Sequence, residues 1–225
     1  MKKIAPFAGL GTCLILYSVI LFAALDYMGQ QGESYSIFNH FISELGSTQF
    51  SAQYLIYNSG IVCGAIAFGT FVYGLSAYAD TKLSRIGIFI GVFSAFLCMG
   101  VGLVPEDNRV PHLILALGFF FMATLSVSIF SWSILKEAKN PFPTYTAVHG
   151  LLIPINFILF MSMPKDLMAV KRSAGPLFER PEIWWLPFFE WVVFALMTTW
   201  ILVMSIKMLQ LQQQEELLPE LVEQT

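Results

Sequence analysis

The feature that most constrains this chain is where its charged residues fall along the sequence. Five long stretches contain no Asp, Glu, Lys or Arg, and a sixth contains Glu190 as its one acid. A helix needs roughly 20 mostly apolar residues to cross the ~30 Å hydrocarbon core of a bilayer, and each stretch is long enough. Such a helix satisfies its own backbone hydrogen bonds, as lipid requires. The six stretches are residues 4–25, 45–79, 86–105, 110–135, 140–164 and 183–206.

The composition excludes a water-soluble globular domain. Charged residues make up 12% of the chain and hydrophobic residues 56%, whereas soluble domains carry about 25% charged residues. The net charge of −3 and the lack of a basic tract argue against nucleic acid as a partner. The partner that the composition predicts is therefore the lipid bilayer.

The predicted fold is all-α: a six-helix transmembrane bundle with a short interfacial helix after the first span. The first apolar run is longer than the roughly 7–15 residues of a signal-peptide core, so we expect a retained helix. A transmembrane domain over residues 1–207 and a polar, acidic cytoplasmic tail over 208–225 account for the chain. The predicted spans are Ile4–Leu25, Phe50–Tyr78, Ile86–Val104, His112–Leu135, Thr144–Met163 and Ile183–Ile206.

The distribution of Lys and Arg predicts the orientation. Short cytoplasmic loops of membrane proteins carry an excess of basic residues, and here the short loops on the side of the N-terminus are the more basic ones. We therefore expect a multi-pass protein of the plasma (inner) membrane with both termini in the cytoplasm. The exception is the last outer loop, Pro164–Glu182, which holds Lys165, Lys171, Arg172 and Arg180.

Small residues at four-residue intervals predict close helix packing. The second predicted span has Gly60 and Gly64, and the third has Gly87, Gly91 and Ala95. This spacing lets two helix backbones approach each other in lipid. The cysteines all fall inside predicted spans without a CxxC spacing, so we expect them to be packing residues.

Polar residues recur at helical spacing in the first outer loop, residues 36–47. Asn39, Ser43 and Ser47 lie four positions apart, and so do His40 and Glu44. In a short helix these side chains would share one broad polar face. The pattern fits two interpretations: an amphipathic cap whose polar groups are solvated, or one wall of a binding or catalytic site.

A second polar segment, Pro105–His112, joins the third and fourth spans on the same side. A carboxylate at Asp107 and an imidazole at His112 are groups that bind a metal or relay a proton, and Arg109 lies between them. The alternative is a plain polar turn, because Pro, Asp and Asn are ordinary turn formers.

Glu190 is the third feature, an ionisable residue inside the last span. Such residues are costly in a bilayer and usually face a partner or a cavity. The alternative is a structural ion pair or a protonated carboxyl. The candidate partners on this side are Arg109, Arg172, Arg180, His40 and His112.

These residues also carry a family resemblance. The stretch from Asn39 to Gly46 resembles the N-x-I-S-E-L-G motif of the bacterial and archaeal membrane proteins grouped as domain of unknown function 998, and Pro105, Asp107 and His112 resemble that family's second polar stretch. The resemblance covers residues 4–206 and implies the six-helix layout, without an activity. A looser similarity to DRAM-like and Frag-related membrane proteins implies a connection with lipids.

Three functions fit these observations. The first is a non-catalytic role in binding or transporting a lipid or small solute, or as a subunit of a complex, with Asn39, Arg109, Arg180 and Glu190 as substrate-binding candidates. The second is a membrane-embedded hydrolase or transferase acting on a lipid or lipid-linked substrate. Its catalytic candidates are Ser43, Glu44, Asp107 and His112, with a divalent metal such as zinc on His40, Asp107 and His112. The third is an ion-pair network that only stabilises the bundle.

Overall fold

A computed structural model describes residues 1–137 and 140–223, without the side chains of residues 172, 173, 176 and 218–223. Six of its helices are long and apolar enough to cross a membrane, which confirms the predicted six-helix fold. The α-helices are α1 (Ala5–Leu25), α2 (Tyr54–Gly74), α3 (Lys82–Leu103), α4 (Arg109–Lys136), α5 (Thr144–Ser162), α6 (Asp166–Ala174) and α7 (Trp185–Glu223), and the 3-10 helices are η1 (Ile42–Gly46), η2 (Leu75–Tyr78) and η3 (Gly175–Leu177).

Two helices differ from the predicted elements. The loop between α5 and α7 contains the short helix α6, which begins with an acid at Asp166 and ends before Gly175, a glycine with φ of +53°. The last span continues as α7 to Glu223, so the described part of the predicted tail is helical. The tail residues 224 and 225 lie outside the described residues.

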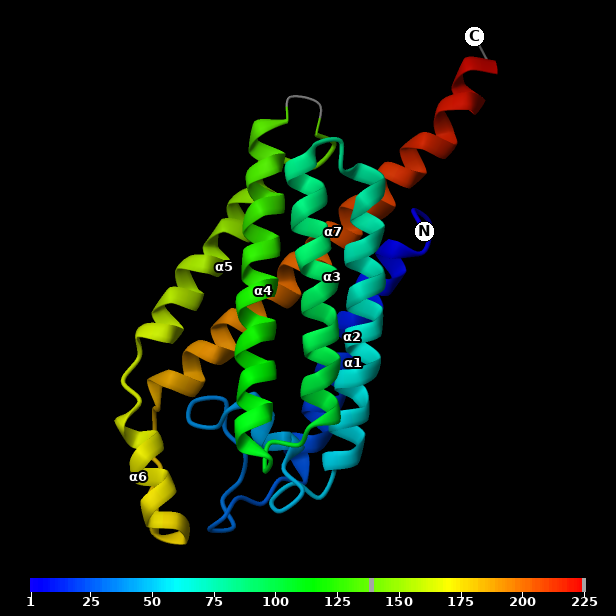
Figure 1. Ribbon diagram of the computed structural model, residues 1–225. Coiled ribbons are helices and arrows are strands. Elements are labelled where there is room, and N and C mark those ends of the chain that lie inside the picture. Colours follow the sequence, from blue (N-terminus) through cyan, green and yellow to red (C-terminus); the bar gives the residue numbers. More distant parts are fainter. Residues whose placement is uncertain (138–139, 224–225) are drawn as a thin grey trace.

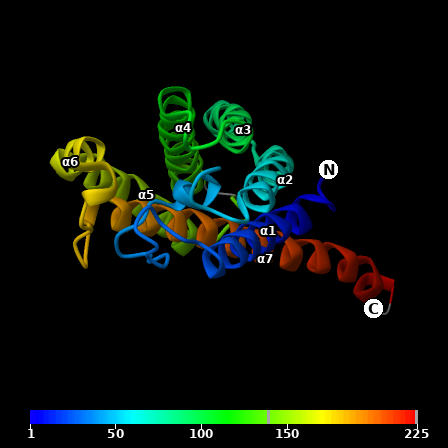
Figure 2. The same cartoon turned by 90° about the horizontal axis from the view of Figure 1, so that it is seen from below.

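The six long helices form a closed ring in the order α1, α2, α3, α4, α5 and α7, with α7 packed back against α1. Seen from below, α1 to α4 form an arc (Figure 2), and in Figure 1 α7 crosses behind these helices while α6 lies below the end of α5. This arrangement brings the last span between the first and the fifth. Residues far apart in sequence therefore meet at the ends of the ring.

Glycines let neighbouring helices approach closely, as their spacing predicted. A Cβ atom at Gly60 would lie 2.4 Å from Val19 on α1, and one at Gly91 would lie 2.5 Å from Ser126 on α4. Ser126 also donates a hydrogen bond of 2.7 Å from its Oγ to the carbonyl oxygen of Gly87. The close approach therefore permits a polar contact between α3 and α4 in addition to van der Waals packing.

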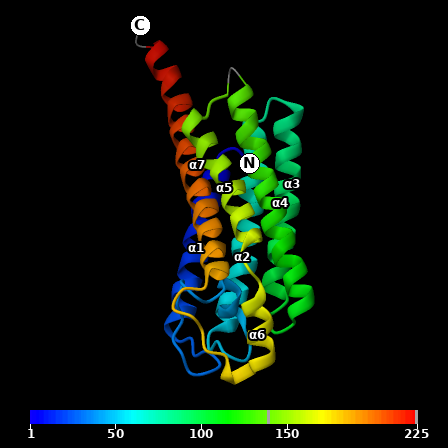
Figure 3. The same cartoon turned by 90° about the vertical axis from the view of Figure 1, so that its left-hand side faces the viewer.

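The two ends of the bundle are built differently. At one end, which we call the α6 end, the segments that follow α1 and α5 fold together beneath the helices (Figure 3). At the other end the N-terminal segment contacts the last part of α7, and Lys2 and Lys3 pair with Glu215 and Glu216 at 2.6 and 3.1 Å. The candidate site residues from the sequence, Asn39 to Glu44, Asp107 to His112, Arg180 and Glu190, all belong to segments that reach the α6 end.

Candidate functional site

The 3-10 helix η1 is the centre of the α6 end. Its entry is held by two carboxylates: Glu190 Oε2 accepts the amide N–H of Ile42 at 2.9 Å, and Glu44 Oε1 accepts that of Phe41 at 3.0 Å. Its exit is fixed by Asn58 on α2, whose Nδ2 donates to the Gly46 carbonyl oxygen at 3.1 Å. The segment is therefore tied to both α2 and α7.

The interpretation of this segment as a solvated amphipathic cap is wrong. His40 and Glu44 are 1% and 4% exposed, and Ser47 is also buried. Removing an ionic group from water costs several kcal/mol, so a buried charge needs an oppositely charged or hydrogen-bonding partner. The partners of Glu44 come from the loop between α5 and α7. The spacing within residues 36–47 could not reveal these partners, because they lie more than 100 residues away in the sequence.

Glu44 is the most heavily paired of these groups. Lys171 Nζ donates to Glu44 Oε2 at 2.9 Å, the Arg180 guanidinium donates to both carboxyl oxygens, and the Tyr27 hydroxyl lies at 3.4 Å from Oε2. Burial raises the pKa of Glu44, but Lys171 and then Arg180 outweigh it and hold that pKa at about 2. Glu44 is thus an anion at neutral pH. We call Tyr27, Glu33, Glu44, Lys171 and Arg180 the Glu44 cluster.

Arg180 joins three segments of the chain. Its Nε donates to Glu33 Oε1 at 3.1 Å and its Nη1 to the backbone oxygen of Asn39 at 2.9 Å, in addition to its contacts with Glu44. The side chain of Asn39 donates from Nδ2 to the Pro181 carbonyl oxygen at 2.9 Å. The predicted substrate-binding candidates Asn39 and Arg180 therefore have protein partners. Their contacts connect the loop between α5 and α7 to the loop between α1 and α2.

His40 is packed beside the cluster between Tyr27 and Tyr35, with ring centroids 5.3 and 5.1 Å away. Its Nδ1 lies 2.7 Å from Asn39 Oδ1, and its Nε2 lies 3.7 Å from Glu33 Oε1. Burial and then the charge of Arg180 lower the pKa of His40 to about 4. His40 is therefore a neutral, enclosed ring at neutral pH.

Asp107 binds the last part of the loop between α1 and α2. Its two carboxyl oxygens accept the Ser47 hydroxyl at 2.7 Å and the Thr48 amide N–H at 2.6 Å. Burial opposes ionisation, but these hydrogen bonds from Ser47 and Thr48 keep the pKa of Asp107 below its usual range. Asp107 thus connects the turn between α3 and α4 to the loop between α1 and α2.

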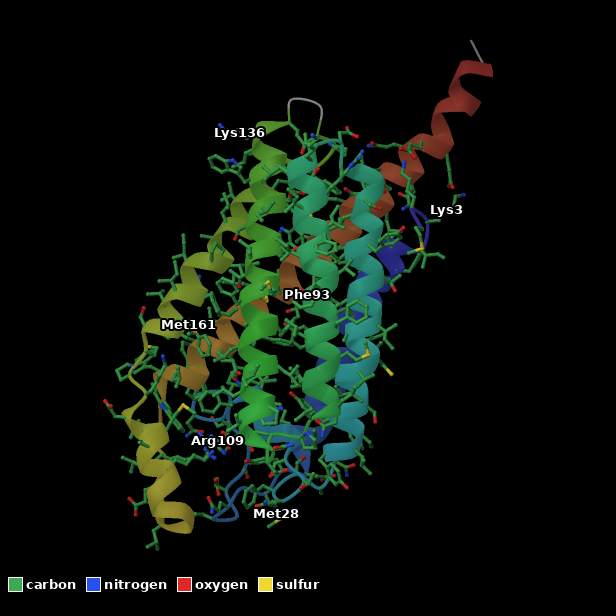
Figure 4. The ribbon with its side chains drawn as sticks, viewed as in Figure 1. Lys3, Met28, Phe93, Arg109, Lys136 and Met161 are labelled. Carbon is green, nitrogen blue, oxygen red and sulfur yellow. The ribbon has the colours of Figure 1, made fainter. Side chains whose placement is uncertain are left out.

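A cavity of about 260 Å³ lies between α4, α5, α6 and α7, with η1 at its end. We call it the apolar cavity, because most of its wall consists of aliphatic and aromatic side chains. Its polar residues are Ser43, Glu106, Arg109, His112, Lys165 and Glu190. Figure 4 shows Arg109 at the α6 end between α4 and α6, and Met161 on α5 nearer the middle of the bundle.

His112 opens onto the apolar cavity from the first turns of α4. Its Nδ1 lies 2.6 Å from the carbonyl oxygen of Val104, an acceptor, so Nδ1 carries the proton. The Nε2 atom then has a lone pair, and it has no hydrogen-bond partner among the described residues. A ring fixed on one side and unsatisfied on the other is able to accept a hydrogen bond from a ligand after a small rotation.

Glu190 uses one carboxyl oxygen to hold η1 and lines the apolar cavity. Its predicted ion pair is wrong for four candidates: among the described side chains, Arg109, Arg180, His40 and His112 form no ion pair with it. The fifth candidate, Arg172, has its side chain outside the described residues. A backbone N–H took the place of the expected cation because η1 begins directly against α7.

A second cavity of about 260 Å³ adjoins the first at the α6 end, and we call it the polar cavity. Its charged residues are Glu44, Glu106, Asp107, Arg109, Lys171 and Arg180. Four residues, Phe41, Glu106, Arg109 and Met168, line both cavities. The apolar space between the helices thus lies next to a charged space under the loops, with these four side chains at their boundary.

The sequence candidates divide between these spaces. Ser43, Arg109, His112 and Glu190 line the apolar cavity, while Glu44, Asp107, Arg109 and Arg180 line the polar one. Asn39 and His40 lie in a separate shallow cavity with Glu33 and Arg180. Sequence reasoning missed Glu106, which flanks Asp107 in the same turn, and Phe41, which lies on the apolar side of η1.

The metal site considered for His40, Asp107 and His112 has no support in the geometry. The three residues line three different cavities. Within residues 1–137 and 140–223, no group of three or more His, Cys, Asp or Glu side chains is placed to hold a metal ion. We therefore assign no metal ligands.

The fold and the site define a six-helix membrane protein with an apolar cavity between its helices and an adjacent charged cavity under its loops. The chain belongs to the family described as "Protein of unknown function (DUF998)", which matches residues 10–207. That range includes both polar motifs and every residue that lines the two cavities. No curated protein and no solved structure matches the chain.

Proposed function

We propose that this protein binds a membrane phospholipid or a similar lipid-linked molecule at the outer leaflet. Its acyl chain would occupy the apolar cavity, and its head group would lie where the apolar and polar cavities meet. The observation that carries the proposal is that the two cavities are adjacent and share Glu106 and Arg109 in their walls. Together their volumes reach the roughly 300–1,000 Å³ typical of ligand sites.

The walls of the apolar cavity support an acyl chain as its occupant. Leu113 and Met161 line the cavity and are 44% and 38% exposed, so its wall reaches the outer surface of the bundle. That surface belongs to α4 and α5, two of the helices that are apolar and long enough to cross a membrane. A lipid tail could therefore enter sideways from the bilayer without crossing water.

The head group is supported by Arg109, which is half-buried at the first position of α4. Among the described residues its guanidinium has no hydrogen bond or ion pair. Arginine binds phosphate through two parallel hydrogen bonds. The N-terminus of α4 has no side-chain cap, and the partial positive charge of a helix N-terminus also favours a phosphate there.

Photo-crosslinking tests the proposal. The purified protein is placed in vesicles that contain a phospholipid with a diazirine at the end of its acyl chain, and crosslinked peptides are identified by mass spectrometry. We expect label on the walls of the apolar cavity, at Leu117, Phe120 or Phe160. Ala116→Trp fills the cavity and should reduce this label at least about tenfold.

Ile114→Trp is the matched control, because Ile114 is exposed on α4 and does not line either cavity. It should leave the label at the cavity walls unchanged. Equal labelling in wild type and Ala116→Trp, or label spread evenly over the surface of the bundle, would refute a lipid in the cavity.

A lipid-directed hydrolase or transferase is the second candidate, because Ser43, His112 and Glu190 line the same cavity as the proposed acyl chain. Ser43 would supply a nucleophilic hydroxyl beside the head group. The test is to incubate wild type and Ser43→Ala with defined phospholipids and follow the products by mass spectrometry. Product formed by wild type and lost in Ser43→Ala, with crosslinking unchanged, would support this role; no product from wild type would remove it.

A further inference from the structure

The junction of the two cavities carries two unpaired charges of opposite sign. Among the described residues, neither Glu106 nor Arg109 forms a hydrogen bond or an ion pair through its side chain, although each lines both cavities. The two side chains also form no ion pair with each other. The junction therefore presents one carboxyl group and one guanidinium without a direct hydrogen bond or ion pair to a described residue, although the charges of Lys171 and Arg109 act on Glu106.

The other charged side chains of the polar cavity have protein partners. Glu44 is bound by Lys171 and Arg180, and Asp107 accepts hydrogen bonds from Ser47 and Thr48. These groups have few sites left for a ligand. The contrast singles out Glu106 and Arg109, because leaving charged groups without partners in a partly buried position costs free energy unless a ligand pairs them.

We propose that the lipid bound at this junction is an aminophospholipid, a phospholipid whose head group carries a primary amine, with its phosphate on Arg109 and its ammonium group on Glu106. This assignment rests on the proposed function and names its ligand class. One zwitterionic head group satisfies both side chains at once.

Other common head groups satisfy the junction less well. A phosphoglycerol head group has no cation, so Glu106 would remain unpaired and close to the phosphate. A choline head group has no N–H to donate, and quaternary ammonium groups are usually held in cages of aromatic rings. The residues shared by the two cavities provide Phe41 as their aromatic side chain, whereas a primary ammonium has three donors for a carboxylate.

The electrostatics of Glu106 agree with a cationic neighbour. Burial and then the charge of Glu44 raise the pKa of its carboxyl group. An ammonium group at contact distance favours the ionised carboxylate, so it lowers the pKa of Glu106 and opposes the effects of burial and of Glu44. Lys171 and Arg109 lower this pKa without a direct contact, so the ligand would supply for Glu106 the contact that Lys171 and Arg180 make with Glu44.

Native mass spectrometry of the full-length protein in detergent tests the assignment. The protein is titrated with dioleoyl phosphatidylethanolamine, phosphatidylglycerol and phosphatidylcholine, which differ in head group only. We expect wild type to bind phosphatidylethanolamine about tenfold more tightly than either of the others, as a charge-assisted hydrogen bond implies. Equal affinity for the three lipids would overturn the assignment.

Variants at the junction separate the two contacts. Glu106→Gln should lose the preference for phosphatidylethanolamine over phosphatidylglycerol, and Glu106→Lys should reverse it. Arg109→Gln should weaken all three lipids by a similar factor, because all three carry the phosphate. Glu179→Gln is the control, since Glu179 is exposed at the same end and lines neither cavity. A preference that survives Glu106→Gln would overturn the assignment even if the variant is well folded.

Two further measurements separate this inference from the proposed function. If Ala116→Trp abolishes binding while wild type shows no head-group preference, the lipid site stands and the aminophospholipid assignment fails. If no lipid binds, both fail. Soluble glycerophosphoethanolamine should not displace the bound lipid at equal concentration, because it lacks the acyl chain that fills the apolar cavity; displacement would make a free head-group compound the ligand instead.

Discussion

The Glu44 cluster and the Glu106–Arg109 junction lie at the same end of the bundle and contain the same kinds of side chain, yet their charges are handled differently. In the cluster the protein supplies every partner: Lys171 and Arg180 for Glu44, and Glu33 as a second acceptor for Arg180. At the junction the described residues supply none. Whether a charged side chain has a protein partner therefore distinguishes residues that hold the structure together from residues available to a ligand. The sequence alone does not make this distinction, because both kinds are charged residues near the ends of the helices.

The largest effect that would sharpen this comparison is expected for Glu44→Gln. Removing the carboxylate leaves Arg180 and Lys171 without their buried partner, and breaking a buried ion pair from one side typically costs about 3–5 kcal/mol. Thermal unfolding of the purified variant in detergent should show a strongly lowered midpoint. Glu179→Gln, which changes an exposed carboxylate at the same end, should leave the midpoint unchanged. A Glu44→Gln midpoint like that of wild type would make the cluster a non-structural site.

The next effect is a pH dependence of stability that arises from His40. Its pKa in the folded protein is about 4, below the ordinary 6.5, so the unfolded chain takes up the proton first as the pH falls. Stability should therefore decrease from about pH 6.5 to about pH 4, by on the order of 2–3 kcal/mol. The contribution of Glu44, with its folded pKa of about 2, should be lost only below about pH 4.5.

His40→Gln removes the titrating ring and should flatten the unfolding midpoint between pH 6.5 and pH 4. The measurement is the same thermal scan at a series of pH values. If the variant keeps the slope of wild type, another group near the cluster titrates in this range and the enclosed position of His40 next to Glu33 and Arg180 is not its cause.

A smaller effect is expected for Asp107→Asn. The amide keeps the size of the side chain but removes the charge that strengthens the hydrogen bonds from Ser47 and Thr48. Its nitrogen would also face one of those donors, so a loss of about 1–2 kcal/mol is expected. Chemical unfolding in urea-containing detergent solution measures it, and Ser47→Ala should give a loss in the same range. A clearly larger loss would mean that Asp107 has a further partner.

The smallest effect on stability should come from Glu106→Gln. This variant also gives the most direct test of the contrast between the Glu44 cluster and the Glu106–Arg109 junction. The Glu106 side chain makes no hydrogen bond or ion pair with a described residue, so the stability of the lipid-free protein should change by less than about 0.5 kcal/mol. Head-group preference, in contrast, should be lost. A large loss of stability in this variant would place Glu106 among the structural residues together with Glu44.

Most of the fold could be predicted because a lipid environment leaves few options. Long stretches without charge, such as residues 110–135, are sufficient to identify a span. The helix α6 was missed because it is only nine residues long and polar on average, although Asp166 at its start and Gly175 after its end are ordinary helix signals. How far α7 continues beyond Lys207 could not be predicted, because hydropathy does not distinguish a polar helix from a loop.

The site was predicted only in part because its decisive contacts join residues far apart in sequence. The spacing of His40 and Glu44 showed that these side chains share a face, but not which way the face points. Glu44 is buried because Arg180 and Lys171 reach it from the loop between α5 and α7. The spacing likewise could not show that Glu190 would bind the backbone of η1 rather than a cation.

The length of α7 has a structural consequence. Its 39 residues form one helix of about 58 Å, nearly twice the thickness of the hydrocarbon core. One end carries Glu190 at the wall of the apolar cavity, and the other carries Glu215 and Glu216, which hold the N-terminal lysines. A single unbroken helix therefore connects the cavity wall at the α6 end to the ion pairs at the other end of the bundle (Figures 1 and 3).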